Sequence, residues 1–204
     1  MKYIVKYMIA GLLALLPAGI AAQNTALLQK LYDGFASHCI AIDCEYAVVT
    51  DGISSKGECK VEVQGICYRM QGSGLDIFCD GESVWVMDSM AKEAIVEPAT
   101  GDSFSYMSNP ALLFRDMDKV FTVVSSAPAG SCVKYQLSAC ESCGIDKATL
   151  EIDNNAVLKT AGFTMDDGSV MNIKVLSMTS QPLKAKDYFY PFDISAEWIV
   201  TDLR

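Results

Sequence analysis

Apolar residues along the chain follow two different periods. Over residues 24–38 they recur at the spacing of a helix, which predicts an amphipathic helix with one apolar stripe. A second helix is predicted over residues 109–119, because Asn109 is a favourable N-cap and Pro110 is tolerated at the first helical position. The apolar sides of the two helices contain Leu27, Leu28, Leu31, Phe35, Leu112, Leu113 and Met117.

Between residues 40 and 95 the period changes to two, which is typical of β-strands with one buried face. Short runs are separated by turn signals at Asp51-Gly52, Gln64-Gly65, Gly72-Ser73-Gly74 and Asp80-Gly81. Regular spacing of this kind indicates an antiparallel meander. Further strands are predicted over residues 120–124, 133–137, 147–152, 158–165 and 171–177.

The predicted fold class is mainly β, of the α+β type. We expect a curled antiparallel sheet, or incomplete β-barrel, closed by two or three helices around an apolar cavity. Two or three helices hardly cover nine or more strands unless the sheet curls around them. A fully packed core is the alternative. The aromatic-rich tail over residues 187–204 is expected to pack back onto the sheet.

The first 22 residues have the layout of a secretory signal peptide. Lys2 and Lys6 precede an apolar run, and small residues follow it up to a predicted cleavage near Ala22. A membrane anchor is the alternative, but the apolar run is short and Pro17 interrupts it. We therefore expect residues 1–22 to be the signal peptide and residues 23–204 to form a single exported domain.

The net charge and the cysteine content can now be interpreted for the exported chain. The full chain has a net charge of −9, and without residues 1–22 it retains 14 basic and 25 acidic residues. A negative balance disfavours nucleic acid and anionic bilayers as partners. All eight cysteines remain, and in an oxidising compartment paired cysteines are the default. Cys44 and Cys59 share one parity and are predicted to form a disulfide across the first hairpin. Cys132 could close a loop with Cys140 or Cys143.

Few residues support catalysis. His38 is the one histidine, beside Cys39 at a predicted helix end, and no nucleophile elbow or phosphate-binding glycine loop occurs. Cys140 and Cys143 form the one Cys-x-x-Cys, but a strand follows it, whereas a redox motif opens a helix. A zinc site usually needs two such pairs. We expect no enzyme activity, no cofactor and no metal.

The order of these elements resembles a family. Four stretches carry the resemblance: Leu75-Asp76-Ile77-Phe78-Cys79-Asp80-Gly81-Glu82-Ser83-Val84-Trp85-Val86-Met87, then Val96-Glu97-Pro98, Ser108-Asn109-Pro110 and the closing Asp202-Leu203-Arg204. They are similar to the periplasmic outer-membrane lipoprotein carrier proteins (LolA-like), in the form found in Bacteroides-like bacteria. The better-known carriers have an Arg-Pro that latches the lid, and here Val63-Gln64-Gly65-Ile66 stands in its place.

The resemblance implies a function. Members of the family shield the acyl chains of lipoproteins in an apolar interior and ferry them from the inner to the outer membrane. The implied partners are an inner-membrane ABC-type release complex and an outer-membrane receptor, and we expect a monomer. Parity along the strands and helices predicts the lipid-binding residues as Phe35, Val61, Val63, Tyr68, Met70, Leu75, Ile77, Trp85, Met87 and Leu112.

Three other functions stay open at this point. The same fold could serve as a lipid- or lipoprotein-sensing module that reports to a membrane signalling partner. A thiol–disulfide enzyme could use Cys140 and Cys143. A secreted β-protein with a filled core would need no ligand, and the methionines would then be ordinary core residues.

Overall fold

The computed structural model describes residues 18–99, 110–140, 143–191 and 194–204, with the backbone alone for residues 18–24, 110–112, 114 and 115. This part of the chain forms one 12-stranded sheet and two α-helices, α2 (Ala18–Ser37) and α3 (Pro110–Val120). A 3₁₀ helix, η1 (Lys186–Phe189), follows the eleventh strand. The strands are β1 (Cys39–Thr50), β2 (Ile53–Gln64), β3 (Cys67–Gly72), β4 (Leu75–Cys79), β5 (Ser83–Asp88), β6 (Glu93–Pro98), β7 (Phe121–Ala129), β8 (Cys132–Ala139), β9 (Ile145–Asp153), β10 (Leu158–Met165), β11 (Val170–Gln181) and β12 (Ile199–Asp202).

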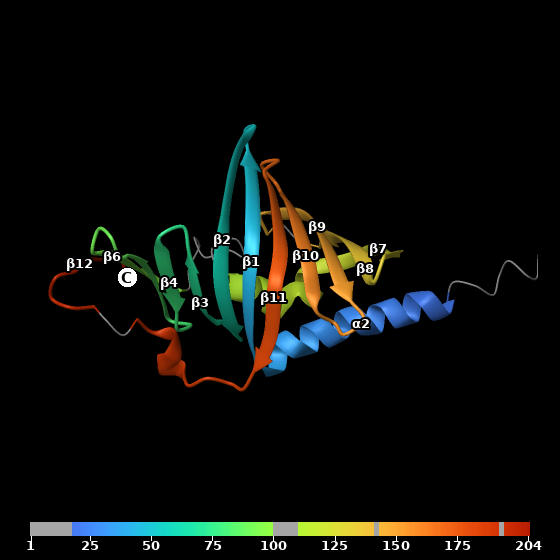
Figure 1. Ribbon diagram of the computed structural model, residues 1–204, viewed down its shortest axis with the longest axis horizontal. Helices are drawn as coiled ribbons and strands as arrows, with labels where there is room; N and C mark the ends of the chain where they lie inside the picture. The colour runs from blue at the N-terminus through green and yellow to red at the C-terminus, as the bar shows by residue number, and fades with distance from the viewer. Residues whose placement is uncertain (1–17, 100–109, 141–142, 192–193) are drawn as a thin grey trace, which may run out of the picture.

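The sheet is curled and does not close. Its strand order is β12-β6-β5-β4-β3-β2-β1-β11-β10-β9-β8-β7, so β12 and β7 are the two edges. Figure 1 shows the long strands β1, β2 and β11 at the centre and the shorter strands turning away on both sides. The prediction of a mostly β, curled sheet is confirmed. All neighbouring strands are antiparallel, as predicted, except the edge strand β12, which pairs with β6 in parallel.

The first hairpin forms where the turn signal predicts it. Asp51 and Gly52 have φ of 51° and 77°, the left-handed values that a type I′ turn requires. Thr50 therefore lies opposite Ile53, and the register continues without a shift to Ile40 opposite Val63. This register determines which side chains share a face over the whole meander from β1 to β6.

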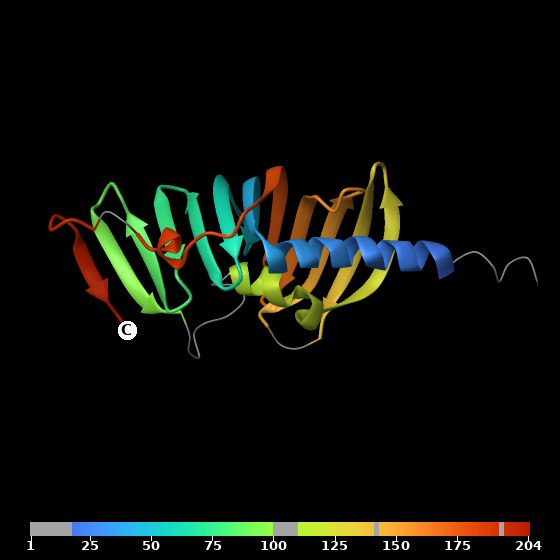
Figure 2. The ribbon, with the colours of Figure 1, turned by 90° about the horizontal axis from the view of Figure 1, so that it is seen from below.

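Both helices cover the same face of the sheet, which we call the helix-side face. In α2, Leu28, Leu31 and Phe35 are buried against the sheet, while Gln29 and Lys30 between them are exposed. The helix begins at Ala18, earlier than predicted, and ends at Ser37. Figure 2 shows α2 running across the strands of the second half of the sheet. Among the residues that the structure describes, neither helix is apolar along a stretch long enough to span a bilayer.

The predicted second helix is also present. Pro110 stands at the start of α3, as predicted for a first helical position. Leu113 and Met117 are buried in the main core, and so is the end of the helix at Val120. Asp116 is buried on the same helix, and its carboxylate accepts a hydrogen bond from Lys119 Nζ at 2.9 Å.

The opposite face, which we call the outer face, is covered near one edge by the C-terminal tail. After β11 the chain crosses β2 to β5 and then adds β12 beside β6 (Figure 2). The side-chain amide of Gln64 exchanges two hydrogen bonds with the backbone of Lys184, at 3.0 and 2.7 Å. The guanidinium of Arg69 lies against the rings of Phe78 and Tyr188, at 5.1 and 4.7 Å. The expectation that the tail packs back onto the sheet is confirmed.

Asp202 and Arg204, near the C-terminus, form an ion pair whose dependence on pH can be predicted. Arg204 Nε and Nη2 donate to the two carboxylate oxygens of Asp202 at 2.9 and 2.6 Å. These hydrogen bonds hold the pKa of Asp202 at about 2, below the usual value of about 3.9. Because the folded-state pKa is the lower one, the pair stabilises the fold above about pH 4, and this contribution is lost as the pH falls toward 2.

An NMR titration of the carboxyl carbons checks this prediction. In the Arg204→Ala variant the pKa of Asp202 should rise toward about 3.9, and the matched variant Lys174→Ala, on a distant exposed strand position, should leave it unchanged. An Asp202 carboxyl that titrates at its ordinary pKa in the unaltered chain would show that the pair does not form.

Candidate functional site

The strand register aligns one continuous row of apolar side chains on the helix-side face. Directly opposing pairs link β1 to β6 without a break, because each strand contributes one aliphatic residue at the same level. We call this set the apolar row, and its members are Ile42, Val61, Met70, Ile77, Val86 and Ile95.

Burial decreases along the apolar row from the centre of the sheet toward its edge. Ile42 is 6% exposed and Val61 9%, Met70 and Ile77 are half-buried, and Ile95 is 42% exposed. The helices explain this gradient, since α2 contacts β1 and β2 while α3 contacts β3. The apolar wall therefore extends beyond the part of the sheet that the helices cover.

Most of the predicted lipid-binding residues lie on this face. Phe35, Val61, Val63 and Tyr68 belong to the main core, and Met70 and Ile77 pack against it. Leu75 is on the same face, two residues from Ile77 along β4, and is 36% exposed. Leu112 lies on α3, but its side chain is outside the described atoms.

Trp85 and Met87 lie on the other face, so their placement with these residues was wrong. They form a second cluster with Phe78, Ala94 and Val96, packed against Ile194 and Trp198 of the tail. All four residues from Val84 to Met87 are apolar, because β5 is covered on both faces, and parity alone cannot then assign a face. The register decides: Ile77 lies opposite Val86.

Three members of the apolar row, Ile42, Val86 and Ile95, were not among the predicted residues. A sequence signal could have found them. Each hairpin from β1 to β6 pairs an even-numbered residue with an odd-numbered one, so residues on the helix-side face alternate in parity from strand to strand. Carrying that alternation through the turn at Gly81 assigns Val86 to this face, and the next turn assigns Ile95.

The site has few groups that could recognise a charge. Tyr68 is 1% exposed, and burial raises the pKa of its hydroxyl above the ordinary value. Acidic residues flank Ile95 on the uncovered strand β6, at Glu93 and Glu97. The described histidine, cysteine and acidic residues form no group of three that could hold a metal ion. The chemistry that this wall offers is contact with apolar chains.

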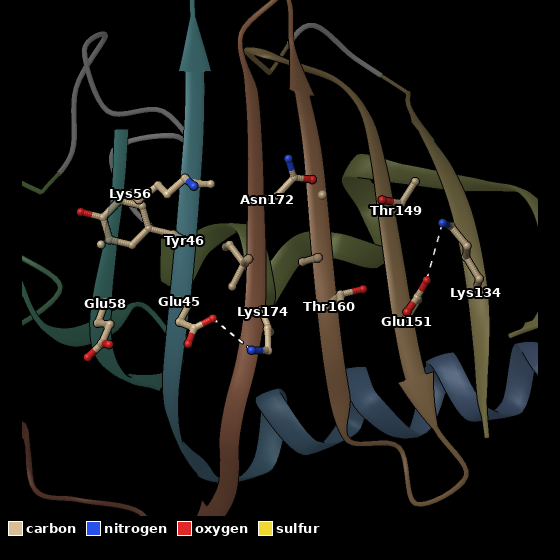
Figure 3. Close-up of a pocket in the computed structure, with 15 residues that line it drawn as sticks. Glu45, Tyr46, Lys56, Glu58, Lys134, Thr149, Glu151, Thr160, Asn172 and Lys174 are labelled. Carbon is tan, nitrogen blue, oxygen red and sulfur yellow. Dashed lines mark hydrogen bonds and ion pairs between the residues drawn. The ribbon is translucent and has the colours of Figure 1, made fainter. Parts of the chain in front are cut away.

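A hollow on the outer face has the opposite character. Its volume is about 700 Å³, and it lies over β1, β2 and β8 to β11. Figure 3 shows charged and polar side chains around it, with dashed contacts between Lys174 and Glu45 and between Lys134 and Glu151. Their charged atoms are 3.1 and 3.6 Å apart. This hollow is polar, so it is not the apolar cavity that was expected.

The cysteines divide by position. Cys44 and Cys59 lie directly opposite each other in the first hairpin, as their parity predicts. Cys132 begins β8 and Cys140 follows its last residue, so the two stand at opposite ends of an eight-residue strand, about 27 Å apart at 3.4 Å per residue. Cys143 precedes β9 at the same end as Cys140. The expectation that Cys132 could pair with either of them was therefore wrong.

Comparison with solved structures shows that the fold occurs elsewhere. An uncharacterized conserved protein from Thermus thermophilus matches 88% of this chain and 98% of its own, with a TM-score of 0.55 and 10% identity. This likeness shows a common fold.

Two further structures are similar at lower TM-scores. LprF from Mycobacterium bovis has a TM-score of 0.42 and 10% identity, over 87% of this chain and 97% of its own. A domain described as an outer membrane lipoprotein-sorting protein, from Vibrio parahaemolyticus, has 0.40 and 10%, over 80% and 94%. No family model and no curated protein sequence matches the chain.

Proposed function

We propose that this protein is a periplasmic carrier that shields the acyl chains of lipoproteins while it ferries them from the inner to the outer membrane. The observation that carries the proposal is the apolar row, which continues past the helices toward Val86 and Ile95 and leaves aliphatic side chains half-buried or exposed. Contiguous apolar surface that the fold leaves accessible marks sites of ligand, protein or membrane contact.

The energetics of such a site suit carriage without catalysis. Burial of an acyl chain contributes about 0.8 kcal/mol per CH₂ group. The protein supplies an apolar sheet face and two helices that cover part of it. The acyl chains of the cargo would contact the apolar side chains that the helices leave uncovered. Release then requires only an acceptor that buries the acyl chains better, such as the receptor and bilayer of the outer membrane.

The proposal includes the organisation inferred from the sequence. Residues 1–22 are removed as a signal peptide, and residues 23–204 act as one domain, as a monomer and without enzymatic activity. An inner-membrane ABC-type complex loads the cargo and an outer-membrane receptor accepts it, as in the lipoprotein carrier family that the sequence resembles. These partners belong to the proposal, as does the apolar cavity that the acyl chains would occupy.

Binding of fluorescent fatty acids of graded chain length tests the proposal. We expect the exported form to bind long-chain probes, and each shortening by two CH₂ groups to weaken binding by up to about 1.6 kcal/mol, or roughly tenfold. A response independent of chain length, or no binding to protein stripped of co-purified lipid, would contradict it.

A transfer assay then separates a carrier from a sensor. Inner membranes that contain a tagged lipoprotein are incubated with the protein and with outer-membrane vesicles. A carrier moves the lipoprotein to the vesicles in proportion to the protein added. Acyl-chain binding without any transfer would instead favour the lipid-sensing module.

A further inference from the structure

Cys44 and Cys59 occupy a distinctive place in the sheet. They lie opposite each other on the helix-side face, two residues along the strands from Ile42 and Val61 of the apolar row. Cys44 is 4% exposed and belongs to the main core, and Cys59 is half-buried and packs against it. Their oxidation state therefore affects the join between β1 and β2 beside the candidate site.

The register shows which kind of ladder position the pair occupies. In a two-residue hairpin the residues that flank the turn, here Thr50 and Ile53, exchange both backbone hydrogen bonds. Hydrogen-bonded and non-hydrogen-bonded pairs then alternate along the ladder. Cys44 and Cys59 are an even number of steps from the turn, with no register shift between, so they form a hydrogen-bonded pair.

This position is unfavourable for a permanent disulfide. Side chains of a hydrogen-bonded pair are farther apart than those of a non-hydrogen-bonded pair, and their Cβ atoms lie toward the upper end of the range of about 4.5–5.5 Å. A disulfide needs Cβ atoms about 3.8 Å apart. A bridge here must draw the two strands together against their own hydrogen bonds, and such strain makes a disulfide easier to reduce.

The neighbouring strand places no side chain beside Cys59. The residue opposite Cys59 on β3 is Gly72, and a Cβ there would lie 2.7 Å from the carbonyl oxygen of Glu58 and 3.1 Å from Cys59 Cβ. No side chain can therefore cover Cys59 from this strand.

The two thiols differ in reactivity. A hydrogen bond between them raises the pKa of Cys44, which burial raises further, and lowers the pKa of Cys59. Since the thiolate is the nucleophile, Cys59 is the residue that reacts first. It is also the more exposed of the two.

From the ladder position, the glycine opposite Cys59 and the unequal exposure of the two cysteines, we infer that Cys44 and Cys59 form a thiol–disulfide exchange site for small thiols and disulfides. Cys59 attacks one sulfur of a small disulfide and expels a thiolate, which leaves a mixed disulfide on Cys59. Cys44 gives up its proton and attacks the Cys59 sulfur, and the second thiolate leaves. Two cysteine thiols are oxidised to one disulfide, the small disulfide is reduced to two thiols, and the two protons pass to these thiols.

Equilibration of the full exported chain in glutathione buffers tests this inference. After alkylation, peptide mass spectrometry gives the bridged fraction of Cys44 and Cys59 apart from the other cysteines. The reference variant carries Cys44→Ser, Cys59→Ser, Glu45→Cys and Glu58→Cys, which moves the pair by one residue to a non-hydrogen-bonded position. We expect the native pair to be half-reduced at a glutathione ratio, [GSH]²/[GSSG], about tenfold or more below that of the reference.

Two outcomes would overturn the inference. The native pair would then resist reduction as strongly as the reference pair, or would stay unbridged in excess oxidised glutathione. If the reference variant does not fold, Asp43→Cys with Lys60→Cys in the same serine background provides another non-hydrogen-bonded pair.

A consequence for lipid binding rests on the proposed function. Because the bridge narrows the join between β1 and β2 beside the apolar row, the oxidised and reduced forms should differ in affinity for a fatty acid probe. If the probe binds neither form, the proposed function fails and the exchange site still stands on the glutathione result. If the probe binds both forms equally, the exchange site does not regulate binding.

Discussion

Replacement of Met70 by glutamate is expected to weaken the binding of a long-chain fatty acid by at least about tenfold. Met70 lies in the middle of the apolar row, between Val61 and Ile77, and is half-buried. A carboxylate at this position must either lose water when an acyl chain covers it or keep the chain away. Both effects oppose binding, whereas the rest of the wall is unchanged.

The matched control is Gln71→Glu. Gln71 is the next residue on β3, points to the outer face and is exposed. It introduces the same carboxylate into the same strand, so it should leave the probe affinity within about twofold. Fluorescence titration measures both variants, and circular dichroism shows whether each is folded. Equal affinities in a folded Met70→Glu variant would place the acyl chains elsewhere on the molecule.

Replacement of Phe189 by alanine is expected to lower the free energy of unfolding by about 3–5 kcal/mol. Phe189 is fully buried in η1, and its ring meets that of Tyr188 edge to face at a centroid distance of 5.3 Å. Truncation leaves a cavity where the tail is held against the sheet. We therefore expect early cleavage of the tail in limited proteolysis as well as a lower midpoint of urea unfolding.

Asp187→Ala supplies the comparison for this prediction. Asp187 belongs to the same 3₁₀ helix and is exposed, and its backbone carbonyl still accepts the hydrogen bond from Tyr190 after the side chain is removed. Its unfolding free energy should change by less than about 0.5 kcal/mol. A similarly small loss in Phe189→Ala would mean that η1 adds little to the stability of the fold.

Local sequence signals were enough to predict the helices and most strands. Asn109-Pro110 marks the start of α3, and Asp51-Gly52 fixes the hairpin that sets the register of β1 and β2. These signals act within a few residues and depend on backbone conformation. The alternation of apolar and polar residues then assigned the correct face to Val61, Val63, Tyr68, Met70 and Ile77.

The incorrect predictions concern positions whose neighbours in the fold are distant in the sequence. Trp85 and Met87 are as apolar as Val84 and Val86, and only the tail, about a hundred residues later in the chain, determines what covers them. The short parallel strand β12 has no alternation to reveal it, because all four of its residues are exposed. Cys132 was paired by proximity in sequence, but an extended strand separates it from Cys140.

The pairing of β1 with β11 has a consequence for how the chain acquires its fold. The strands β1 to β6 and β7 to β11 are two meanders in which each strand meets its sequence neighbour. Within the described sheet, the pairing of residues 39–49 with residues 170–181 joins them. Such a contact must close a long loop, so its entropic cost is high and it is slow to form. If the chain is exported as proposed, each meander can assemble as its residues leave the translocation channel. The continuous sheet, and with it the full width of the helix-side face, can form only after almost the whole chain has been exported.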